Sequence, residues 1–209
     1  RKLANERNII LIFDEVVTGF RMHRGGYQSI CGITPDLACF SKALANGMPI
    51  SALVGKENIM RECTKIFFSL TFAGEALSLS AAKASMEFID QNDVINVVNK
   101  KGEYLEKNLN TILKKAQLDD MIEIIGYPTK QILLIKDEVI RTFIIQELIK
   151  NSILTNGGNT LCYSHTQNDL DYIIKIYDKT INDLKKFLDD KTLPEKIDGK
   201  IIRQSISNR

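Results

Sequence analysis

Residues 9–21 read Ile-Ile-Leu-Ile-Phe-Asp-Glu-Val-Val-Thr-Gly-Phe-Arg, an apolar run that ends at an acidic pair. The run over 9–13 is rich in branched side chains, as is typical of a strand covered on both faces in a parallel sheet. Asp14 follows it directly, and a carboxylate at a buried strand end needs a cation or hydrogen-bond donors to offset its desolvation. Asp14 is therefore either the N-cap of a following helix or a carboxylate that holds a protonated heterocycle.

A lysine stands in a similar place further along the chain. Residues 37–40 and 50–54 predict two more strands of this kind, and residues 41–49 between them read Ser-Lys-Ala-Leu-Ala-Asn-Gly-Met-Pro. Lys42 is either a surface side chain that snorkels past the strand end or a desolvated amine that attacks a carbonyl. Because ligands bind at the carboxyl edge of open α/β sheets, Asp14 and Lys42 are the candidate site residues.

The rest of the chain predicts a mainly helical second part. Apolar spacing predicts helices over 74–117, with a break at 91–93, and around 139–150. Strands are predicted over 121–125 and 131–135, and a final helix begins at a Thr166–Asp169 capping box. We expect the carboxy-terminal part of a large α/β domain over 1–75, connecting helices over 76–116 and a small α+β domain over 117–209.

Composition narrows the class of protein. The net charge is +2, too small to indicate a nucleic-acid or membrane-surface protein, and the apolar runs are too short to span a bilayer. The four cysteines form no CxxC pair and there are only two histidines, so no metal site is predicted. Free thiols in the cytoplasm are the expectation.

Asp14 and Lys42 together indicate one kind of site. A lysine and an aspartate at two strand ends, 28 positions apart, match a pyridoxal-phosphate site. The lysine forms a Schiff base, and the carboxylate keeps the pyridine nitrogen protonated. At contact distance that attraction is on the order of 4 kcal/mol at a moderate effective dielectric, which favours the charged ring.

Several further motifs occur over nearly the whole chain, in the same order as in one family of enzymes. The sequence resembles the class III (fold-type I) pyridoxal-phosphate aminotransferases, in the branch that contains glutamate-1-semialdehyde 2,1-aminomutase, and it resembles their carboxy-terminal half only. The matching segments are 12–16, 18–21, 32–37, 41–42, 47–49, 68–72, 74–78, 154–155, 157–158 and 163–166.

The resemblance implies four residue roles. Lys42 carries the Schiff base and moves the proton between substrate and cofactor carbons. Asp14 pairs with the pyridinium nitrogen, and Val16 lies against one face of the ring. Thr71 donates a hydrogen bond to the cofactor phosphate across a homodimer interface, with capping of the helix near Gly74 as the alternative.

Other residues of these motifs have structural interpretations. Glu15 is read as a structural neighbour of Asp14, and His165 as a residue that stabilises a turn. Gly157 and Gly158 are read as positive-φ turn residues. Arg21 either approaches a substrate carboxylate or forms a salt bridge at the strand end.

The sequence also departs from the family. Asn46 stands where many relatives have glycine. The family's remaining cofactor and substrate residues come mostly from a preceding half, which this chain does not contain.

The predicted function is amino-group transfer or amino migration on a small amino donor or acceptor, with pyridoxal 5′-phosphate as cofactor. A homodimer or a complementing amino-terminal half is the expected partner. The alternative is an inactive fragment or interaction module that keeps the family fold.

Overall fold

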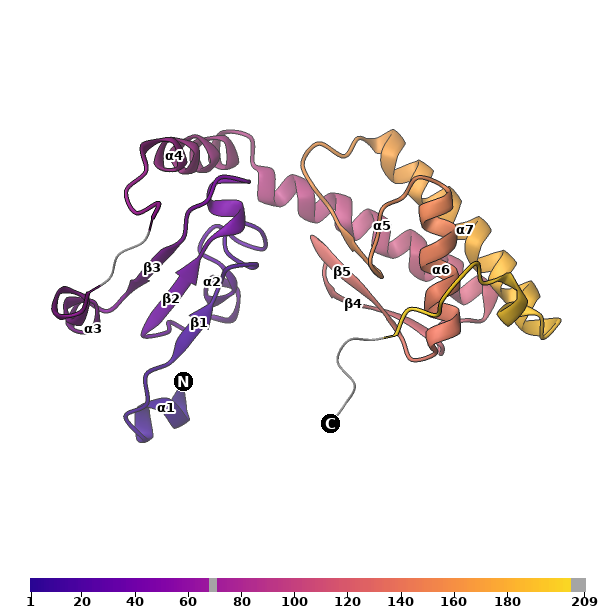
Figure 1. Cartoon of the computed structure of the whole chain (residues 1–209), viewed down its shortest axis with the longest axis horizontal. Helices are drawn as coiled ribbons and strands as arrows, with labels where there is room; N and C mark the ends of the chain where they lie inside the picture. Colours follow the sequence, from indigo (N-terminus) through magenta and orange to yellow (C-terminus); the bar gives the residue numbers. More distant parts are fainter. Residues whose placement is uncertain (68–70, 204–209) are drawn as a thin grey trace. The chain divides into compact units, whose positions relative to one another are not determined.

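The computed structural model describes residues 1–67 and 71–203, which form two compact units. The first unit is Arg1–Val97 and the second is Val98–Arg209. Figure 1 labels their helices and strands. The domain boundaries expected from the sequence, after residues 75 and 116, stay predictions.

The first unit is built on a three-stranded sheet with the order β1-β2-β3. Short helices and turns connect the strands, and one longer helix follows them. The elements are α1 (Lys2–Glu6), β1 (Ile12–Asp14), α2 (Tyr27–Cys31), β2 (Leu37–Phe40), a 3₁₀ turn (Lys42–Leu44), β3 (Ala52–Gly55), α3 (Glu57–Met60), a second 3₁₀ turn (Arg61–Lys65) and α4 (Ala76–Gln91).

Only one of the two strand pairs in this sheet is parallel. β1 and β2 pair in parallel, with Asp14 opposite Cys39, whereas β2 and β3 pair antiparallel, with Phe40 opposite Ala52. The prediction that the third strand is also of the parallel type is therefore wrong. The connection over 41–51 contains only a 3₁₀ turn, and parallel strands need a longer crossover, usually a helix.

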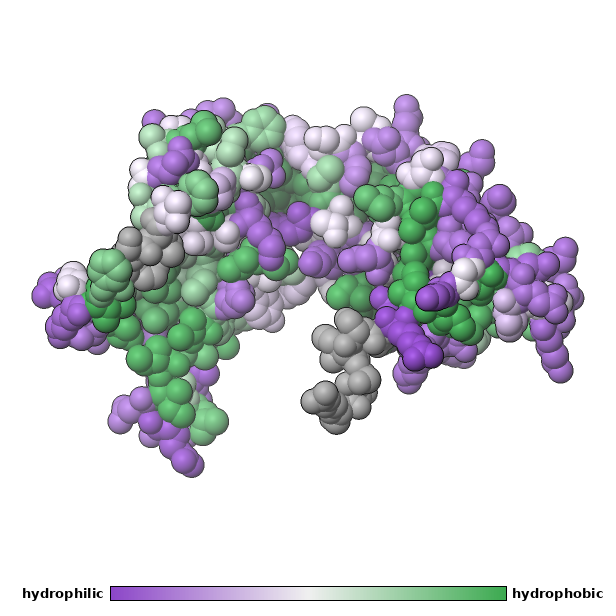
Figure 2. All heavy atoms as spheres, in the orientation of Figure 1, coloured by the Kyte–Doolittle hydropathy of each residue, from purple (hydrophilic) through white to green (hydrophobic). Residues whose placement is uncertain are grey.

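The expected burial of the first strand on both faces is also not observed. Ile9, Ile10 and Ile12 are 56%, 52% and 55% exposed, and β1 is an edge strand of the described sheet. Figure 2 shows apolar residues gathered on the surface over β1 and β2. The apolar run was a correct signal for a strand, but no described element covers these three side chains.

The second unit is a three-stranded antiparallel sheet, in the order β4-β5-β6, with three helices. Its long first helix begins within the first unit. The elements are α5 (Val94–Ala116), β4 (Ile122–Tyr127), β5 (Lys130–Ile135), α6 (Glu138–Lys150), β6 (Gly158–Thr160), α7 (Gln167–Asp189) and a 3₁₀ turn (Leu193–Lys196). The predicted Thr166–Asp169 capping box is present at the start of α7.

The core of the second unit contains a chain of buried polar side chains. The Tyr177 hydroxyl donates to Asn159 Oδ1 at 2.9 Å, and Asn159 Nδ2 donates to Gln131 Oε1 at 3.3 Å. Gln131 Nε2 then donates to the Gly102 carbonyl at 2.8 Å. Burial raises the pKa of the Tyr177 hydroxyl. Because each group has a partner, the network ties α7, β6, β5 and α5 together without an unpaired polar cost.

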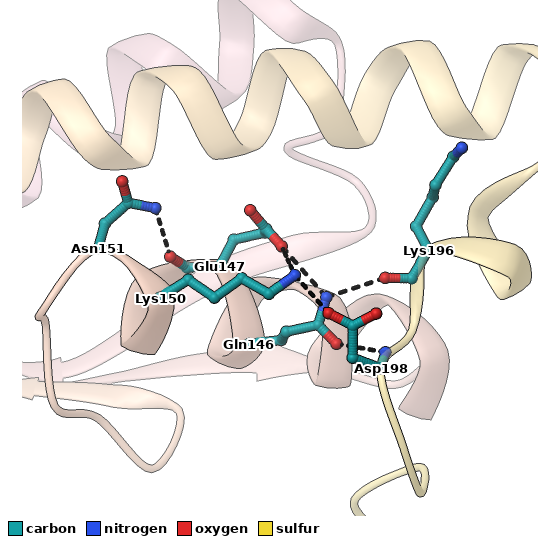
Figure 3. A network of polar contacts seen from close by, with 6 residues as sticks. All are labelled: Gln146, Glu147, Lys150, Asn151, Lys196 and Asp198. Atoms are coloured by element: carbon teal, nitrogen blue, oxygen red, sulfur yellow. Dashed lines mark hydrogen bonds and ion pairs between the residues drawn. The ribbon is translucent and has the colours of Figure 1, made fainter.

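The segment after α7 is fastened along α6, as Figure 3 shows. Gln146 donates to the Lys196 carbonyl at 2.9 Å and accepts from the Asp198 amide at 2.7 Å. Lys150 forms ion pairs with Asp198 at 2.6 Å and Glu147 at 2.9 Å, and these carboxylates raise its pKa. Two hydrogen bonds to backbone groups and one ion pair thus hold residues 196–198 against α6, while the Lys150–Glu147 pair lies within this helix.

Two properties of residues 1–67 and 71–203 bear on function. No helix there is both long and apolar enough to cross a membrane. No three or more His, Cys, Asp and Glu side chains in that part of the chain gather as metal ligands do.

Candidate active site

Asp14 and Lys42 lie at the same edge of the first sheet. Asp14 ends β1 and pairs in register with Cys39 of β2, and Lys42 comes three residues after Cys39. Because β1 and β2 are parallel, both residues lie at the carboxyl ends of neighbouring strands. Both side chains are exposed. A carboxylate and an amine on this edge are placed where open α/β sheets bind ligands.

The Asp14 carboxylate is oriented by a turn and does not cap a helix. Its Oδ1 accepts a hydrogen bond from the Val16 amide at 3.0 Å. The helix that follows, α2, begins only at Tyr27, so the helix-cap interpretation of Asp14 is wrong. Val16 is half-buried beside this carboxylate. A short side-chain-to-backbone turn of this kind fixes the direction of the carboxylate.

Lys42 occupies a strained backbone position. Its φ is +45°, a left-handed conformation that residues other than glycine adopt rarely. Ser41, just before it, donates its hydroxyl to the Ile50 carbonyl at 2.7 Å, and the Asn46 amide donates to the Lys42 carbonyl at 2.9 Å. Asn46 has φ +46°, which explains why asparagine can replace a glycine there. The turn over 41–50 therefore holds Lys42 in place by its backbone.

Thr71 borders a hollow of about 580 Å³ in the first unit. The hollow is lined on one side by residues from 41–51, including Ser41, and on the other by residues from 71–79. Glu75 is the N-cap of α4, since its carboxylate accepts from the Leu77 and Ser78 amides at 2.6 and 2.7 Å. The alternative that Thr71 caps this helix is therefore wrong. Residues 68–70 of its motif lie outside the described residues.

Glu15 is a structural residue of this site whose contacts the sequence analysis missed. Its side chain is 1% exposed, and its carboxylate accepts from the Tyr27 amide at 2.8 Å and the Gln28 amide at 2.9 Å. The Thr18 hydroxyl donates to the same carboxylate. The two amides are 12 and 13 positions away, so no local spacing in the sequence could have indicated the contact.

The motif residues of the second unit have structural roles. His165 closes a turn: its Nδ1 accepts from the Cys162 amide at 3.1 Å, as its interpretation as a turn residue expected. Gly157 has the predicted positive φ, +104°. For Gly158 the prediction is wrong, because its φ is not positive and a Cβ there would collide with the Gln131 carbonyl. That glycine permits close strand pairing between β5 and β6.

Comparison with known proteins identifies the family. The family model "Aminotransferase class-III" matches residues 1–127. This match covers more than half of the chain, so the protein belongs to the class-III aminotransferases.

Individual relatives agree with this assignment. The chain is 34% identical over 197 residues to the 3-aminobutyryl-CoA aminotransferase of Cloacimonas acidaminovorans, a match covering 90% of the chain and 47% of that protein. It is 45% identical over 131 residues to the glutamate-1-semialdehyde 2,1-aminomutase of Nitrosopumilus maritimus, covering 61% and 29%. The chain therefore spans less than half the length of these relatives.

Solved structures establish the fold. The FumI protein of Sphingopyxis sp. MTA144, in a PLP form, superimposes with a TM-score of 0.83 at 23% identity, over 94% of this chain and 49% of that one. A transaminase with PLP bound gives a TM-score of 0.82 at 19% identity, over 89% and 47%. The predicted fold, part of the fold-type I α/β architecture, is confirmed. The cofactor of this family is pyridoxal phosphate.

Proposed function

We propose that this chain carries the lysine half of a pyridoxal-phosphate site and acts in amino-group transfer or amino migration on a small amino compound. The observation that carries the proposal is the placement of Asp14 and Lys42 at the carboxyl ends of neighbouring parallel strands. Family membership supports the same chemistry.

The residues of this edge fit such a cofactor. Lys42 has an exposed amine, with no ion pair or hydrogen bond to that amine among the described residues, so it is available to bond to an aldehyde. Asp14 presents a carboxylate whose direction the Val16 amide fixes. When bound, pyridoxal phosphate supplies a protonated ring that stabilises negative charge on the substrate carbon.

Each residue then has a defined task. Lys42 would hold the cofactor aldehyde covalently, and its amine would carry the proton removed from the substrate carbon. Asp14 keeps the ring nitrogen protonated by its negative charge. Val16 packs against the ring. Thr71 donates its hydroxyl to the cofactor phosphate of a neighbouring subunit, so the active form is a homodimer.

The test is covalent labelling. Pyridoxal phosphate is added to the chain, the adduct is reduced with borohydride, and the labelled peptide is located by mass spectrometry. We expect label on the peptide that contains Lys42, an absorbance band that Lys42→Ala abolishes, and no effect of the control Lys83→Ala, on the exposed face of α4. Label spread evenly over surface lysines, with no loss in Lys42→Ala, would falsify the proposal.

A second function, binding of another polypeptide, is favoured by the apolar surface of the first unit. Ile9, Ile10 and Ile12 lie exposed at the β1 edge, and Phe67 is 95% exposed. The partner that we propose is a polypeptide supplying the part of the family length that this chain does not span.

The four cysteines are free thiols, which supports a cytoplasmic setting.

This second proposal is tested by co-purification. The chain is co-expressed with the amino-terminal half of the Cloacimonas relative, and the complex is measured by light scattering. A complex that forms with the wild-type chain but not with Ile12→Lys supports binding at the β1 edge. A chain that stays at 23.6 kDa in both cases contradicts it.

A further inference from the structure

Glu15 follows Asp14 in the chain, but its side chain points to the opposite side of the strand end. Asp14 is exposed and Glu15 is 1% exposed, as expected for successive residues of a strand. The Glu15 amide donates to the Cys39 carbonyl at 2.9 Å, which extends the β1–β2 pairing by one residue. Its backbone therefore belongs to the sheet, while its side chain is free to hold the loop that follows.

The contacts of the Glu15 carboxylate hold both ends of the loop over 16–26. The Thr18 hydroxyl donates to it near the start of the loop, and the Tyr27 and Gln28 amides donate to it after the end. Gly26, with φ +79°, passes so close that a Cβ there would collide with this carboxylate. A buried carboxylate that satisfies three donors fixes the loop far more firmly than surface contacts do.

The fixed loop in turn packs against the segment that carries Lys42. A Cβ at Gly19 would collide with the Phe40 ring, and the rings of Phe20 and Phe40 meet edge to face at 5.8 Å. Phe20 also packs against the buried cluster of Leu44, Ala45 and Ala82, and the first two of these lie two and three residues after Lys42. A continuous set of contacts therefore runs from Glu15, through the loop, to both sides of Lys42.

We propose that Glu15 is a positioning residue: by anchoring the 16–26 loop it sets the direction of the Asp14 carboxylate and the backbone of Lys42 relative to each other. The inference rests on the proposed function of Asp14 and Lys42. The left-handed conformations of Phe20 and Lys42, at φ +58° and +45°, are strained and persist only where surrounding contacts hold them. Glu15 supplies those contacts on the loop side.

The test compares wild type with Glu15→Gln and the milder Thr18→Val, which removes one donor at nearly constant shape. Amide hydrogen exchange is followed in the whole chain by mass spectrometry. We expect exchange on the order of tenfold faster in residues 16–28 of Glu15→Gln, and faster exchange also at the Leu44, Ala45 and Asn46 amides, which close the Lys42 turn. In Thr18→Val we expect faster exchange at the same amides, but by a smaller factor.

Exchange that accelerates only within 16–31, in both variants, would show a purely local anchor and overturn the inference. Should Glu15→Gln unfold the first unit, Thr18→Val alone decides between these outcomes. The same samples are labelled with pyridoxal phosphate and borohydride, and we expect less label at Lys42 in both variants. If Lys42 is labelled in the wild type and equally in both variants, the inference about Glu15 is also overturned. If Lys42 is not labelled even in the wild type, the proposed function of Lys42 is refuted, and the role of Glu15 is then decided by hydrogen exchange alone.

Discussion

Asp36, just before β2, is the carboxylate of the first unit that receives donors from three separate segments. It accepts from the Leu11 amide at 2.8 Å and forms ion pairs with Lys56 at 2.6 Å and Arg1 at 2.8 Å. The Leu11 hydrogen bond, followed by those of Lys56 and Arg1, holds its pKa well below the ordinary value. Asp36 thus joins the chain before β1, the start of β2 and the segment after β3.

A pH dependence of stability follows from this depressed pKa. The unfolded chain takes up a proton at Asp36 near pH 4, while the folded chain resists it, so this contribution is complete above about pH 4 and is lost as the pH falls further. We expect the urea midpoint of the first unit to drop between pH 5 and pH 3. Asp36→Asn should have a lower midpoint at pH 7 and a flatter decline. Parallel declines in the two proteins would contradict this role.

At this scale, what the sequence predicted depended on whether a residue's partners are local. The Thr166–Asp169 box was predictable because its two residues are three positions apart on one helix. Asp14 and Lys42 were recognisable because a charged residue after an apolar strand is unusual. The contacts of Glu15, and the hydrogen bond from Tyr177 to Asn159, could not be predicted. Their partners come from other elements, and no sequence pattern indicates such contacts.

Among the elements, α5 approaches the β4–β5 turn unusually closely at one point. Gly102 is buried on this helix, and a Cβ there would collide with the backbone of Pro128. The Gly102 carbonyl also accepts the Gln131 side chain. The helix and the turn therefore meet backbone to backbone, which only glycine permits.

Gly102→Ala tests this contact. Alanine is the better helix former by about 1 kcal/mol, yet we expect it to lower the free energy of unfolding by about 1–3 kcal/mol because the collision forces α5 and the turn apart. Glu103→Ala, the exposed neighbour, is the control and should change stability by less than about 0.5 kcal/mol. The measurement is urea unfolding followed by circular dichroism. A Gly102→Ala protein as stable as wild type would show that the turn yields freely.

Most elements were predicted from periodicity, and the errors have identifiable causes. The helices α4 to α7 have long amphipathic or capped patterns, which tolerate small boundary errors. β6, over Gly158–Thr160, was not predicted: Gly158 was expected in a turn, and glycine and asparagine are poor strand formers. Its pairing with β5 supplies what its own residues do not. The antiparallel direction of β3 likewise depends on its connection and not on its composition.

For the whole molecule, burial is divided unequally between the two units. Of the 27 buried hydrophobic residues in the described chain, 5 lie in the first unit and 22 in the second. The first unit also holds the exposed β1 edge. The second unit therefore has the larger core for its size.

We expect residues 94–209, expressed alone, to fold. They contain all of α5 and the 22 buried residues of the second unit, and a core of this kind supports cooperative unfolding. Thermal unfolding followed by circular dichroism should give a single sigmoidal transition, whereas residues 1–93 alone should give a broad one. A gradual melt of 94–209 would mean that its core needs the first unit.

The open edge of β1 also governs how copies of this protein behave in concentrated solution. Edge strands that present branched apolar side chains are templates for aggregation, and natural proteins usually protect them with charge or proline. Residues 9–13 contain neither, and a net charge of +2 gives little long-range repulsion between copies. While nothing pairs with the outer edge of β1, colloidal stability thus falls with protein concentration, and of the two acidic residues that follow only the exposed Asp14 acts as a charged gatekeeper, because Glu15 is buried.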